Sequence, residues 1–278
     1  MPDTYIVPNP NKALWEKGDF TRIAETMRQS GEELVDSLDL RAGMRVLDLA
    51  SGDGTTAIPA ARTGAEVLGI DIASNLVDAG NARARGMGLH NLRFEEGDAS
   101  NLAGIADKSF DLVVSIFGAM FAPRPQDVAR EMVRVTKPGG RIVMGNWIPG
   151  DPTLVAQILK ISAAYTPPPP AGFVSPMTWG DEAQVRERFE VAGISPNGVK
   201  FERSTWFFRD EGPATGLFET FRHFYGPTMN AFEAAAKDGR EEQLASELRA
   251  LFVEQNRGSE NTAIPATFLK VSVNVGRN

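Results

Sequence analysis

Apolar, β-branched runs alternate with longer helical segments between residues 45 and 147. The runs are expected to form five strands, at residues 46–50, 66–72, 92–98, 110–118 and 140–147. The segments between them have the character of helices, at residues 55–64, 73–88 and 125–140. In the last segment, Val128, Met132 and Val135 recur at spacings of four and three, which places them on one helix face. Strands and helices that alternate in this way predict a parallel sheet covered on both faces.

The segments outside this unit have looser patterns. Residues 12–38 are expected to form one or two amphipathic helices against the edge of the sheet or over its mouth. Further helices are expected at residues 154–165, at 181–192 with Asp181 as the N-cap, at 218–225 and at 230–255. Two further strands are expected at residues 200–209 and 267–275, with Phe201, Phe207, Val271, Val273 and Val275 as candidate inward positions. The tetrapeptide at residues 137–140 is expected to end a helix and turn the chain into the fifth strand.

Composition places the chain among ordinary globular proteins, since 42% of its 278 residues are hydrophobic and 23% are charged. It contains no cysteine, which excludes disulfides, thiolate metal sites and cysteine nucleophiles. Its two histidines, His90 and His223, are 133 residues apart, so no metal centre is expected. Neither a Gly-x-Ser-x-Gly nucleophile elbow nor a P-loop occurs, which removes support for hydrolase and nucleotide-triphosphatase activities.

The charge balance bears on the expected partners. The chain has 29 Lys and Arg against 36 Asp and Glu, a formal net charge of -7. Nucleic acid is not an expected partner, because tight sequence-independent binding depends on clustered Lys and Arg. The first residues lack the continuous apolar core of a secretory signal, and the longest apolar run, residues 112–122, is too short to span a bilayer. We therefore expect no membrane partner and a cytoplasmic location.

The segment that carries chemistry is a glycine turn at residues 50–54, which follows a strand and opens a helix. Glycine lets a ligand approach the backbone, and a helix N-terminus offers unpaired amides to an anionic group. Gly52 and Gly54, with Ala57, also fit the dinucleotide-binding fingerprint, and Asp71 lies 19 residues beyond Gly52, where a ribose-binding acid belongs. An NAD-dependent oxidoreductase therefore remains an alternative at this point.

Further motifs separate these alternatives. Asp48 precedes the turn, Asp71 ends the second strand, Asp98 follows the third, and the tetrapeptide at residues 137–140 enters the fifth. With these four motifs in order, residues 40–147 resemble the class I S-adenosylmethionine-dependent methyltransferases of the small-molecule type. The resemblance implies a doubly wound, Rossmann-like α/β fold with a mainly parallel seven-stranded sheet. Strands six and seven would then lie at about residues 197–209 and 266–276, with a helical lid between them.

The resemblance also implies roles for individual residues. Asp48 would contact the methionyl ammonium of S-adenosylmethionine, and Asp71 both ribose hydroxyls. The remaining cofactor residues would be Ala50, Ser51, Gly52 and Gly54 in the turn, Ile72 and Leu76 against the adenine, Asp98 and Ala99 at the adenine amino group, and Ile116 or Phe117 at the methionine end. Ala50 stands where the family usually has its first glycine, which requires a compatible backbone angle there. Carboxylates at two strand ends also suit a ligand with a diol and an ammonium group.

The acceptor site is predicted from aromatic residues near the sheet's carboxyl edge. The candidates are Trp15, Phe20, Phe121, Trp147 and Tyr225, although aromatic side chains at such places are more often part of the core. His223 is the candidate catalytic base. We expect residues 1–40 to form helices over the cofactor site, residues 41–209 and 262–278 the methyltransferase core, and residues 210–261 a helical lid.

The predicted function is methyl transfer from S-adenosylmethionine to an oxygen, nitrogen or carbon atom of a small, partly apolar acceptor, with S-adenosylhomocysteine as the product. A general base is optional for this chemistry, since the sulfonium already activates the methyl group. The alternatives are an NAD-dependent oxidoreductase and a non-catalytic cofactor-binding protein. No feature of the sequence indicates an oligomeric state.

Overall fold

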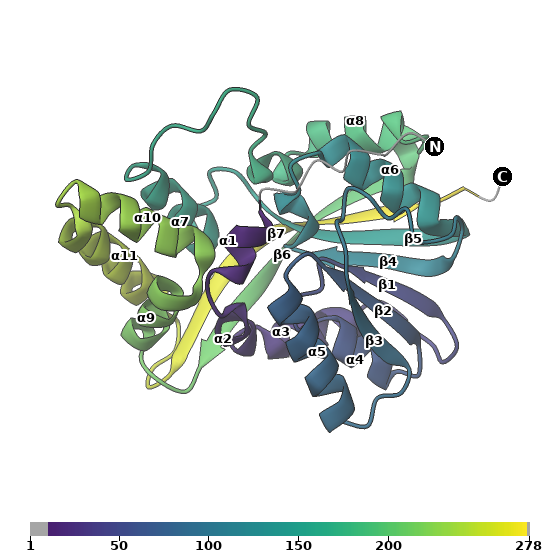
Figure 1. The fold of residues 1–278 in the computed structure, drawn as a ribbon, viewed down its shortest axis with the longest axis horizontal. Helices are drawn as coiled ribbons and strands as arrows, with labels where there is room; N and C mark the ends of the chain where they lie inside the picture. The colour runs from purple at the N-terminus through teal and green to yellow at the C-terminus, as the bar shows by residue number, and fades with distance from the viewer. Residues whose placement is uncertain (1–10, 277–278) are drawn as a thin grey trace.

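One seven-stranded sheet organises the structure, a computed structural model that describes residues 11–276 (Figure 1). Its strands are β1 (Arg45–Leu49), β2 (Glu66–Asp71), β3 (Leu92–Glu96), β4 (Phe110–Ile116), β5 (Thr136–Trp147), β6 (Val199–Asp210) and β7 (Thr262–Asn274). They lie in the order β3-β2-β1-β4-β5-β7-β6, and only β7 runs antiparallel to its neighbours β5 and β6. The predicted fold class, a mainly parallel doubly wound sheet, is confirmed.

The order of the strands determines where a ligand can bind. β1 pairs with β2 on one side and with β4 on the other, and Asp48 lies between Gly69 and Val114 in this register. The chain therefore builds the sheet outward in two directions from the junction of β1 and β4. In such sheets the crevice for ligands opens at the carboxyl ends of the strands, at the point where the order reverses.

Helices cover both faces of the sheet, as the strand pattern predicted. α3 (Arg28–Asp36), α4 (Ala57–Arg62) and α5 (Ser74–Gly86) lie on one face, and α6 (Pro125–Val135) and α8 (Glu182–Val191) lie on the other (Figure 1). Successive residues of a strand point to opposite faces. Val46 accordingly packs in one apolar core and Leu47 in the other, and both are fully buried. Asp181 caps α8, as expected, because its carboxylate accepts the backbone N–H groups of Ala183 and Gln184.

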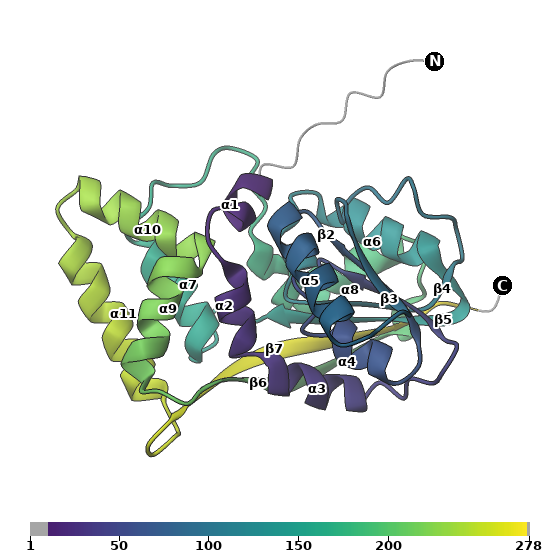
Figure 2. The same ribbon diagram turned by 60° about the horizontal axis from the view of Figure 1, so that its bottom comes forward.

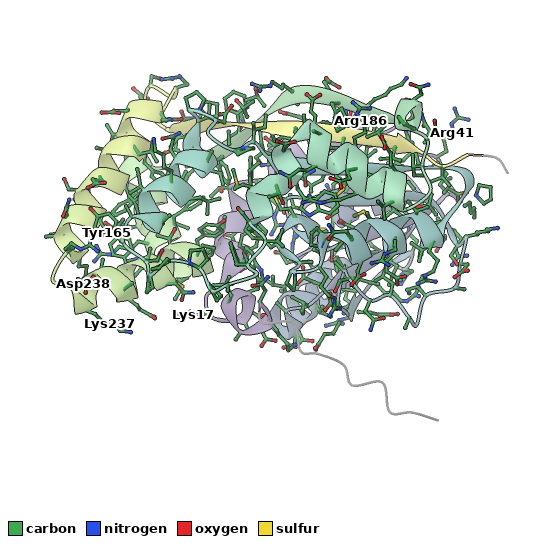
Figure 3. All side chains as sticks on the ribbon, turned by 90° about the horizontal axis from the view of Figure 1, so that it is seen from above. Lys17, Arg41, Tyr165, Arg186, Lys237 and Asp238 are labelled. Carbon is green, nitrogen blue, oxygen red and sulfur yellow. The ribbon has the colours of Figure 1, made fainter. Side chains whose placement is uncertain are left out.

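A second group of helices lies at the end of the long β6–β7 hairpin (Figure 2). It contains α9 (Ala214–Phe224), α10 (Gly226–Lys237) and α11 (Glu241–Gln255), which are inserted between β6 and β7, together with α7 (Leu154–Ala163). Tyr165, which Figure 3 shows among these helices, joins α7 to α11, since its hydroxyl donates to Glu247 Oε1 at 2.6 Å. The helix expected over residues 230–255 is divided, because Gly239 adopts a φ of +67° between α10 and α11.

Three details of the sequence-based picture were wrong or incomplete. The segment before the sheet forms three helices rather than one or two, namely α1 (Lys12–Glu16), α2 (Phe20–Glu25) and α3. The tetrapeptide at residues 137–140 is not a turn but an irregular part of β5, where the pairing with β4 jumps from Thr136 to Arg141. Gly139, at a φ of +80°, permits this bulge.

The inward positions of β6 were the third error. Phe207 was expected to point inward, but its neighbours Trp206 and Phe208 are the buried residues, at 1% and 2% exposure. The strand changes the face that it buries along its length. Near Phe201 it packs under α8, and further along, its other face turns toward α9 and the cleft described below. Val271 and Val273 on β7 are buried as predicted.

Short 3-10 turns connect several elements: η1 (Ala119–Phe121), η2 (Pro176–Gly180) and η3 (Pro196–Gly198). Of the helices between residues 11 and 276, none combines the length and the apolar character that crossing a bilayer requires.

Candidate functional site

A deep cleft opens at the carboxyl ends of β1, β2 and β4, where the order of the strands reverses. Its empty space, counted to the open mouth, is about 1130 Å³. Such a cleft at the carboxyl ends of parallel strands is where ligands of α/β proteins usually bind. Its walls fall into two chemically different halves.

The first half is here called the carboxylate half. It consists of Asp48, Ala50, Ser51, Gly52, Asp53, Asp71, Ile72, Leu76, Gly97 and Ala99. The second is called the aromatic half and consists of Trp15, Phe20, Phe117, Phe121, Trp147, Trp206, Phe208, Phe221 and Tyr225.

The glycine turn in the carboxylate half is held by Asp71. Its Oδ2 accepts the backbone N–H of Gly52 at 2.8 Å, and its Oδ1 accepts the N–H of Ala73 at 2.9 Å. Gly52 has a φ of +55°, and a Cβ built on it would meet no atom within 4 Å, so the turn leaves space for a ligand against its backbone. Gly54 does not line the cleft. A Cβ there would press against Phe94 at 2.8 Å, so this glycine serves packing.

Asp48 is a buried acid of the carboxylate half that lacks a partner on one of its oxygens within residues 11–276. It is 2% exposed, and its Oδ2 has no hydrogen-bond partner among the described residues. Burial, and next the charge of Asp71, raise the pKa of Asp48 to about 8. Burial also raises the pKa of Asp71. The unpaired oxygen of Asp48 therefore lacks a cation or a hydrogen-bond donor. A ligand with an ammonium group supplies the cation, and a diol on the same ligand supplies donors to the neighbouring Asp71.

The backbone is strained where the two halves meet. Ala50, directly after β1, has a φ of +57°, and Phe117, directly after β4, has a φ of +63°. Residues with a Cβ rarely adopt this conformation, and it costs about 1–3 kcal/mol. The two segments lie so close that a Cβ on Gly118 would be 2.4 Å from the carbonyl oxygen of Ala50. This close approach holds both segments in place, and strained backbone of this kind is concentrated at functional sites.

Asp53 is a residue that the sequence did not single out. It is 1% exposed and lies between two arginines of different helices. Arg28 of α3 donates to its Oδ1 at 2.9 Å and also to Thr55 Oγ1 at 2.9 Å. Arg83 of α5 donates to the backbone oxygen of Asp53 at 2.6 Å. The arginines therefore fix the glycine turn from two sides. Both lie far from Asp53 along the chain, so no local sequence pattern predicts these contacts.

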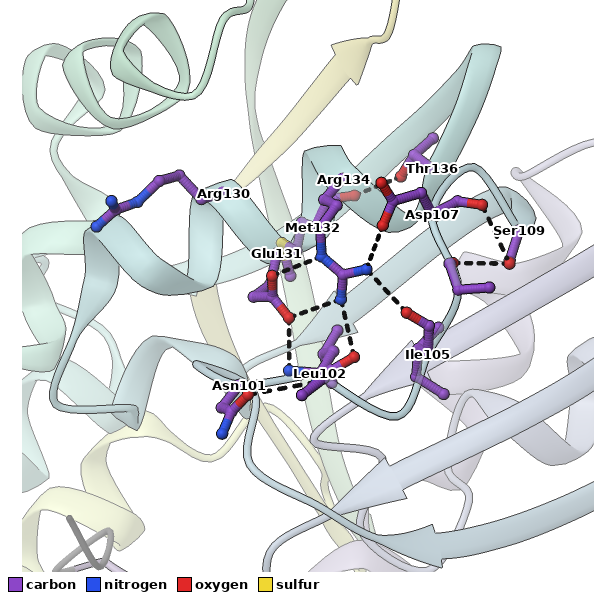
Figure 4. A network of polar contacts seen from close by, with 12 residues as sticks. Asn101, Leu102, Ile105, Asp107, Ser109, Arg130, Glu131, Met132, Arg134 and Thr136 are labelled. Carbon is purple, nitrogen blue, oxygen red and sulfur yellow. Dashed lines mark hydrogen bonds and ion pairs between the residues drawn. The ribbon is translucent and has the colours of Figure 1, made fainter. Parts of the chain in front are cut away.

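The loop after β3 is held by Arg134 (Figure 4). Its guanidinium donates to the backbone oxygens of Leu102 and Ile105, both at 2.8 Å, and to Glu131 on its own helix. The hydrogen bond from Arg134 lowers the pKa of Glu131, which keeps this carboxylate charged. The network connects α6 to the loop that begins with Gly97.

Asp98 in this loop does not line the cleft. Its Oδ1 accepts the backbone N–H of Ser100 at 2.8 Å and the Ser100 hydroxyl at 2.7 Å, the arrangement of an Asx turn. Its neighbours Gly97 and Ala99 line the cleft instead.

The aromatic half is a connected set of rings from distant parts of the chain. Phe117 stacks on Trp147 with ring centroids 3.6 Å apart. Trp15 lies edge-on to Phe121 at 4.9 Å and tilted against Tyr225 at 6.1 Å. Burial raises the pKa of the Tyr225 phenol, so it is uncharged at neutral pH. The half thus combines apolar surface with a neutral hydroxyl and carries no charge.

α1 joins the sheet to the inserted helices across this cleft. Lys12 Nζ donates to the carbonyl oxygen of Ile72 at 2.9 Å, and Glu16 Oε1 accepts the backbone N–H of Ser74 at 3.1 Å. On the other side, Lys17 Nζ lies 2.7 Å from Glu233 Oε1 of α10, and Figure 3 shows Lys17 beside the inserted helices. The ends of this short helix therefore contact both parts of the molecule.

The structure brings most of the predicted site residues together. Ten of the predicted cofactor residues line the cleft: Asp48, Ala50, Ser51, Gly52, Asp71, Ile72, Leu76, Ala99, Ile116 and Phe117. Gly54 and Asp98 do not. All five acceptor candidates line it: Trp15, Phe20, Phe121, Trp147 and Tyr225. Trp206, Phe208 and Phe221 line it as well and were missed.

His223 does not reach the cleft. Its side chain is 60% exposed, and Nδ1 is 2.9 Å from the backbone oxygen of Glu219 on the same helix. The prediction of His223 as a catalytic base is therefore corrected, because this exposed residue is not among those that line the cleft. Phe221 of α9 and Tyr225, directly after this helix, do line the cleft.

Comparison with known proteins agrees with this geometry. A family model described as a methyltransferase domain matches residues 47–144, which include β1, β2 and the glycine turn. An uncharacterized protein of Mycobacterium tuberculosis is 35% identical over 88% of this chain and 86% of its own length. A demethylmenaquinone methyltransferase of Paenarthrobacter aurescens is 39% identical over 41% of this chain and 43% of its own length. The chain belongs to the class I methyltransferase family.

A solved structure supports the same fold for this methyltransferase. A putative methyltransferase from Bacillus halodurans superposes with a TM-score of 0.59, at 15% identity, over 89% of this chain and 99% of the other. The resemblance noted in the sequence is thereby confirmed. S-adenosylmethionine is the cofactor of the family, and the buried unpaired acid and the open glycine turn of this methyltransferase fit its ammonium and ribose groups.

Proposed function

We propose that this chain transfers a methyl group from S-adenosylmethionine to a small, partly apolar acceptor bound in the aromatic half of the cleft. The observation that carries the proposal is the division of one cleft into a half with buried carboxylates and a half with uncharged rings. The first suits a zwitterionic cofactor, and the second an apolar molecule placed beside it.

The residues of the carboxylate half have distinct tasks in this proposal. Asp48 binds the ammonium group, Asp71 the ribose hydroxyls, and the turn from Ala50 to Gly52 the backbone-facing side of the cofactor. Ile72 and Leu76 pack against the adenine. The cofactor supplies a methyl group that its sulfonium has already activated.

The protein's own contribution is then to align the acceptor and exclude water. The rings of the aromatic half cover the acceptor, and no ionised base faces it. The neutral Tyr225 hydroxyl can orient an acceptor oxygen or nitrogen but does not remove its proton at neutral pH. The net charge of -7 argues against a nucleic-acid acceptor, because tight binding of its phosphates depends on clustered Lys and Arg.

An NAD-dependent oxidoreductase is disfavoured by electrostatics. A dinucleotide places its pyrophosphate against the glycine turn and the helix after it. Here Asp53 lies within the turn and Asp48 directly before it, both buried and both lining the cleft. Because the pKa of Asp48 is about 8, an ammonium group can favour its ionised form and pair with it, whereas a phosphate gains no such pair.

Calorimetric titration tests the proposal. S-adenosylmethionine and S-adenosylhomocysteine should both bind, NADH should not, and Asp71→Ala should weaken binding at least about tenfold, because a buried partner of two hydrogen bonds is lost. Asp111→Asn is the matched control, since Asp111 lies on β4 at the opposite edge of the sheet and pairs with Lys137. Absence of S-adenosylmethionine binding, or tighter binding of NADH, would refute the proposal.

A further inference from the structure

The aromatic half contains no charged side chain. The acidic side chains among the cleft-lining residues are Asp48, Asp53 and Asp71, and all of them belong to the carboxylate half. A carboxylate, phosphate or ammonium group on the acceptor would lose its hydration in the aromatic half without gaining an ion pair, which is costly. The surroundings therefore favour an acceptor that is uncharged.

Trp206 provides the second observation. It is 1% exposed, it lines the cleft, and its indole Nε1 has no hydrogen-bond partner among residues 11–276. A buried donor without a partner costs about 1–3 kcal/mol, and native structures contain few of them. The Trp206 side chain forms part of the cleft wall, but its Nε1 is itself covered. A bound molecule that moves the neighbouring rings can supply the missing acceptor atom.

The arrangement of the rings around Trp206 favours a flat molecule. Trp206 lies edge-on to Phe117 at 5.0 Å, and Phe117 in turn stacks on Trp147 with an interplanar angle of 8°. Phe208 lies edge-on to Phe221 at 5.5 Å. Walls made of both ring faces and ring edges offer a conjugated ring the offset-stacked and edge-to-face contacts that aromatic groups prefer.

Aromatic walls also attract organic cations, but two features of this cleft oppose a cation. A bound molecule that reaches the unpaired N–H of Trp206 meets the positive end of its dipole. The sulfonium of S-adenosylmethionine, in the proposed function, adds a positive charge beside it. Both repel a cation and both attract an oxygen lone pair.

We propose that the acceptor is an uncharged, flat conjugated ring that carries a carbonyl oxygen, and that the indole N–H of Trp206 donates a hydrogen bond to this oxygen. This inference rests on the proposed methyl transfer, and it names Trp206 as the residue that selects oxygenated rings. The hydroxyl of Tyr225, which also lines the cleft, is a second polar group available to such a ring.

A matched series of naphthalenes tests this assignment. The protein loaded with S-adenosylhomocysteine is titrated with 2-acetylnaphthalene and with 2-ethylnaphthalene, which has the same ring without the carbonyl. We expect the acetyl compound to bind about tenfold more tightly, the value of one net hydrogen bond. In Trp206→Phe the two compounds should bind equally, while the affinity for S-adenosylhomocysteine stays unchanged.

Trp179→Phe is the control variant. Trp179 also has a buried indole Nε1 without a partner, but its ring is covered by the Arg188 guanidinium at 4.6 Å and does not line the cleft. Its loss should leave the preference for the acetyl compound intact. The chain has four tryptophans, so their indole signals can be assigned in nitrogen–proton correlation spectra from single Phe substitutions. Only the acetyl compound should move the Trp206 signal downfield. If the signals of the other three tryptophans are assigned from their own variants, the remaining signal belongs to Trp206, so the measurement does not require that Trp206→Phe folds.

Charged analogues complete the test. We expect 2-naphthoate and (2-naphthyl)trimethylammonium to bind at least about tenfold more weakly than 2-acetylnaphthalene. Tighter binding of either ion, a carbonyl preference that survives in Trp206→Phe, or no binding of any naphthalene would overturn the assignment. The same titrations without cofactor separate the two proposals. If the protein prefers the acetyl compound but does not bind S-adenosylhomocysteine, only the proposed methyl transfer is refuted. If it binds S-adenosylhomocysteine but shows no preference for the acetyl compound, only the role of Trp206 is refuted.

Discussion

The two halves of the cleft differ in how the chain builds them. The carboxylate half comes mainly from β1, β2 and the turn between them, and its shape depends on backbone angles and on hydrogen bonds to one aspartate. The aromatic half takes its rings from α1, α2, η1, β5, β6 and α9 and from the residues directly after β4 and α9, which lie far apart in the sequence. We therefore expect the loss of one charge to alter ligand binding in the carboxylate half, whereas the shape of the aromatic half should tolerate the substitution of a single ring. Each prediction below alters the carboxylate half, and binding of 2-acetylnaphthalene reports whether the aromatic half has changed with it.

Removal of the Asp48 charge should have the largest effect. Asp48→Asn keeps the shape of the side chain but offers no anion to the ammonium group, and breaking a buried charge pair costs about 3–5 kcal/mol. We expect affinity for S-adenosylmethionine to fall at least about 100-fold in calorimetry, with 2-acetylnaphthalene binding unchanged. An unchanged cofactor affinity would show that Asp48 has no part in binding.

The same variant should be more stable than the parent without cofactor at pH 9. Because the folded-state pKa of Asp48 is raised to about 8, the folded protein holds a proton there that the unfolded chain has already released. This contribution to stability is present below the ordinary Asp range and is lost as the pH rises through about 8. Asn does not ionise, so the melting temperature of Asp48→Asn should exceed that of the parent at pH 9, and the difference should shrink toward pH 6.

Loss of the Arg28 contact should have the next largest effect. In Arg28→Met the buried Asp53 carboxylate loses one of its two arginine partners, and hydrogen bonds to charged groups contribute about 1.5–3 kcal/mol. We expect the free energy of unfolding to fall by about 2 kcal/mol in denaturant titration. Arg22→Met is the control, since its pairs with Asp19 and Glu25 are exposed and long, at 3.9 and 3.8 Å, and contribute little. Equal losses in both variants would contradict the role of Arg28.

The pH dependence of cofactor binding should be smaller and confined to the carboxylate half. A cation beside Asp48 favours the ionised carboxylate, so binding below about pH 8 releases a proton from this residue. Affinity for S-adenosylmethionine should accordingly rise with pH between 6 and 8, by at most about tenfold per unit. Calorimetry in buffers of different ionisation enthalpy measures the released proton. Asp48→Asn should remove the dependence, and 2-acetylnaphthalene should show none.

The carboxylate half could be predicted from the sequence because its information is local. Asp48, the glycine turn and Asp71 follow apolar strands directly, and parallel strands bring their carboxyl ends to one edge. Asp98 shows the limit of prediction from such local information. An aspartate after a strand can reach a ligand or close its own turn, and the Ser100 partner that decides between these outcomes belongs to a common turn motif.

The aromatic half could be predicted only in part because its residues meet through tertiary packing. Trp147 and Phe121 were found from their places after strands, but Trp206 and Phe208 were missed because alternation alone does not tell which face of β6 is buried at each point. The prediction that His223 is a catalytic base was wrong for a related reason. The residues of α9 that face the cleft are set by the packing of the inserted helices, which the sequence of α9 alone does not specify.

The smallest expected effect concerns Ala50, where the two halves touch. At a φ of +57° its methyl group is unfavourable, whereas glycine adopts this angle freely, so Ala50→Gly should raise the free energy of unfolding by about 0.5–1 kcal/mol. Ala236→Gly is the control, because Ala236 is exposed within α10 and glycine there should cost about 0.5–1 kcal/mol. Denaturant titration of both variants measures whether the free energy of unfolding rises in Ala50→Gly and falls in Ala236→Gly. Affinity for S-adenosylmethionine and for 2-acetylnaphthalene should stay within about twofold of the parent. A loss of stability in Ala50→Gly equal to that in Ala236→Gly would show that the methyl group packs against Gly118 more favourably than the backbone angle costs.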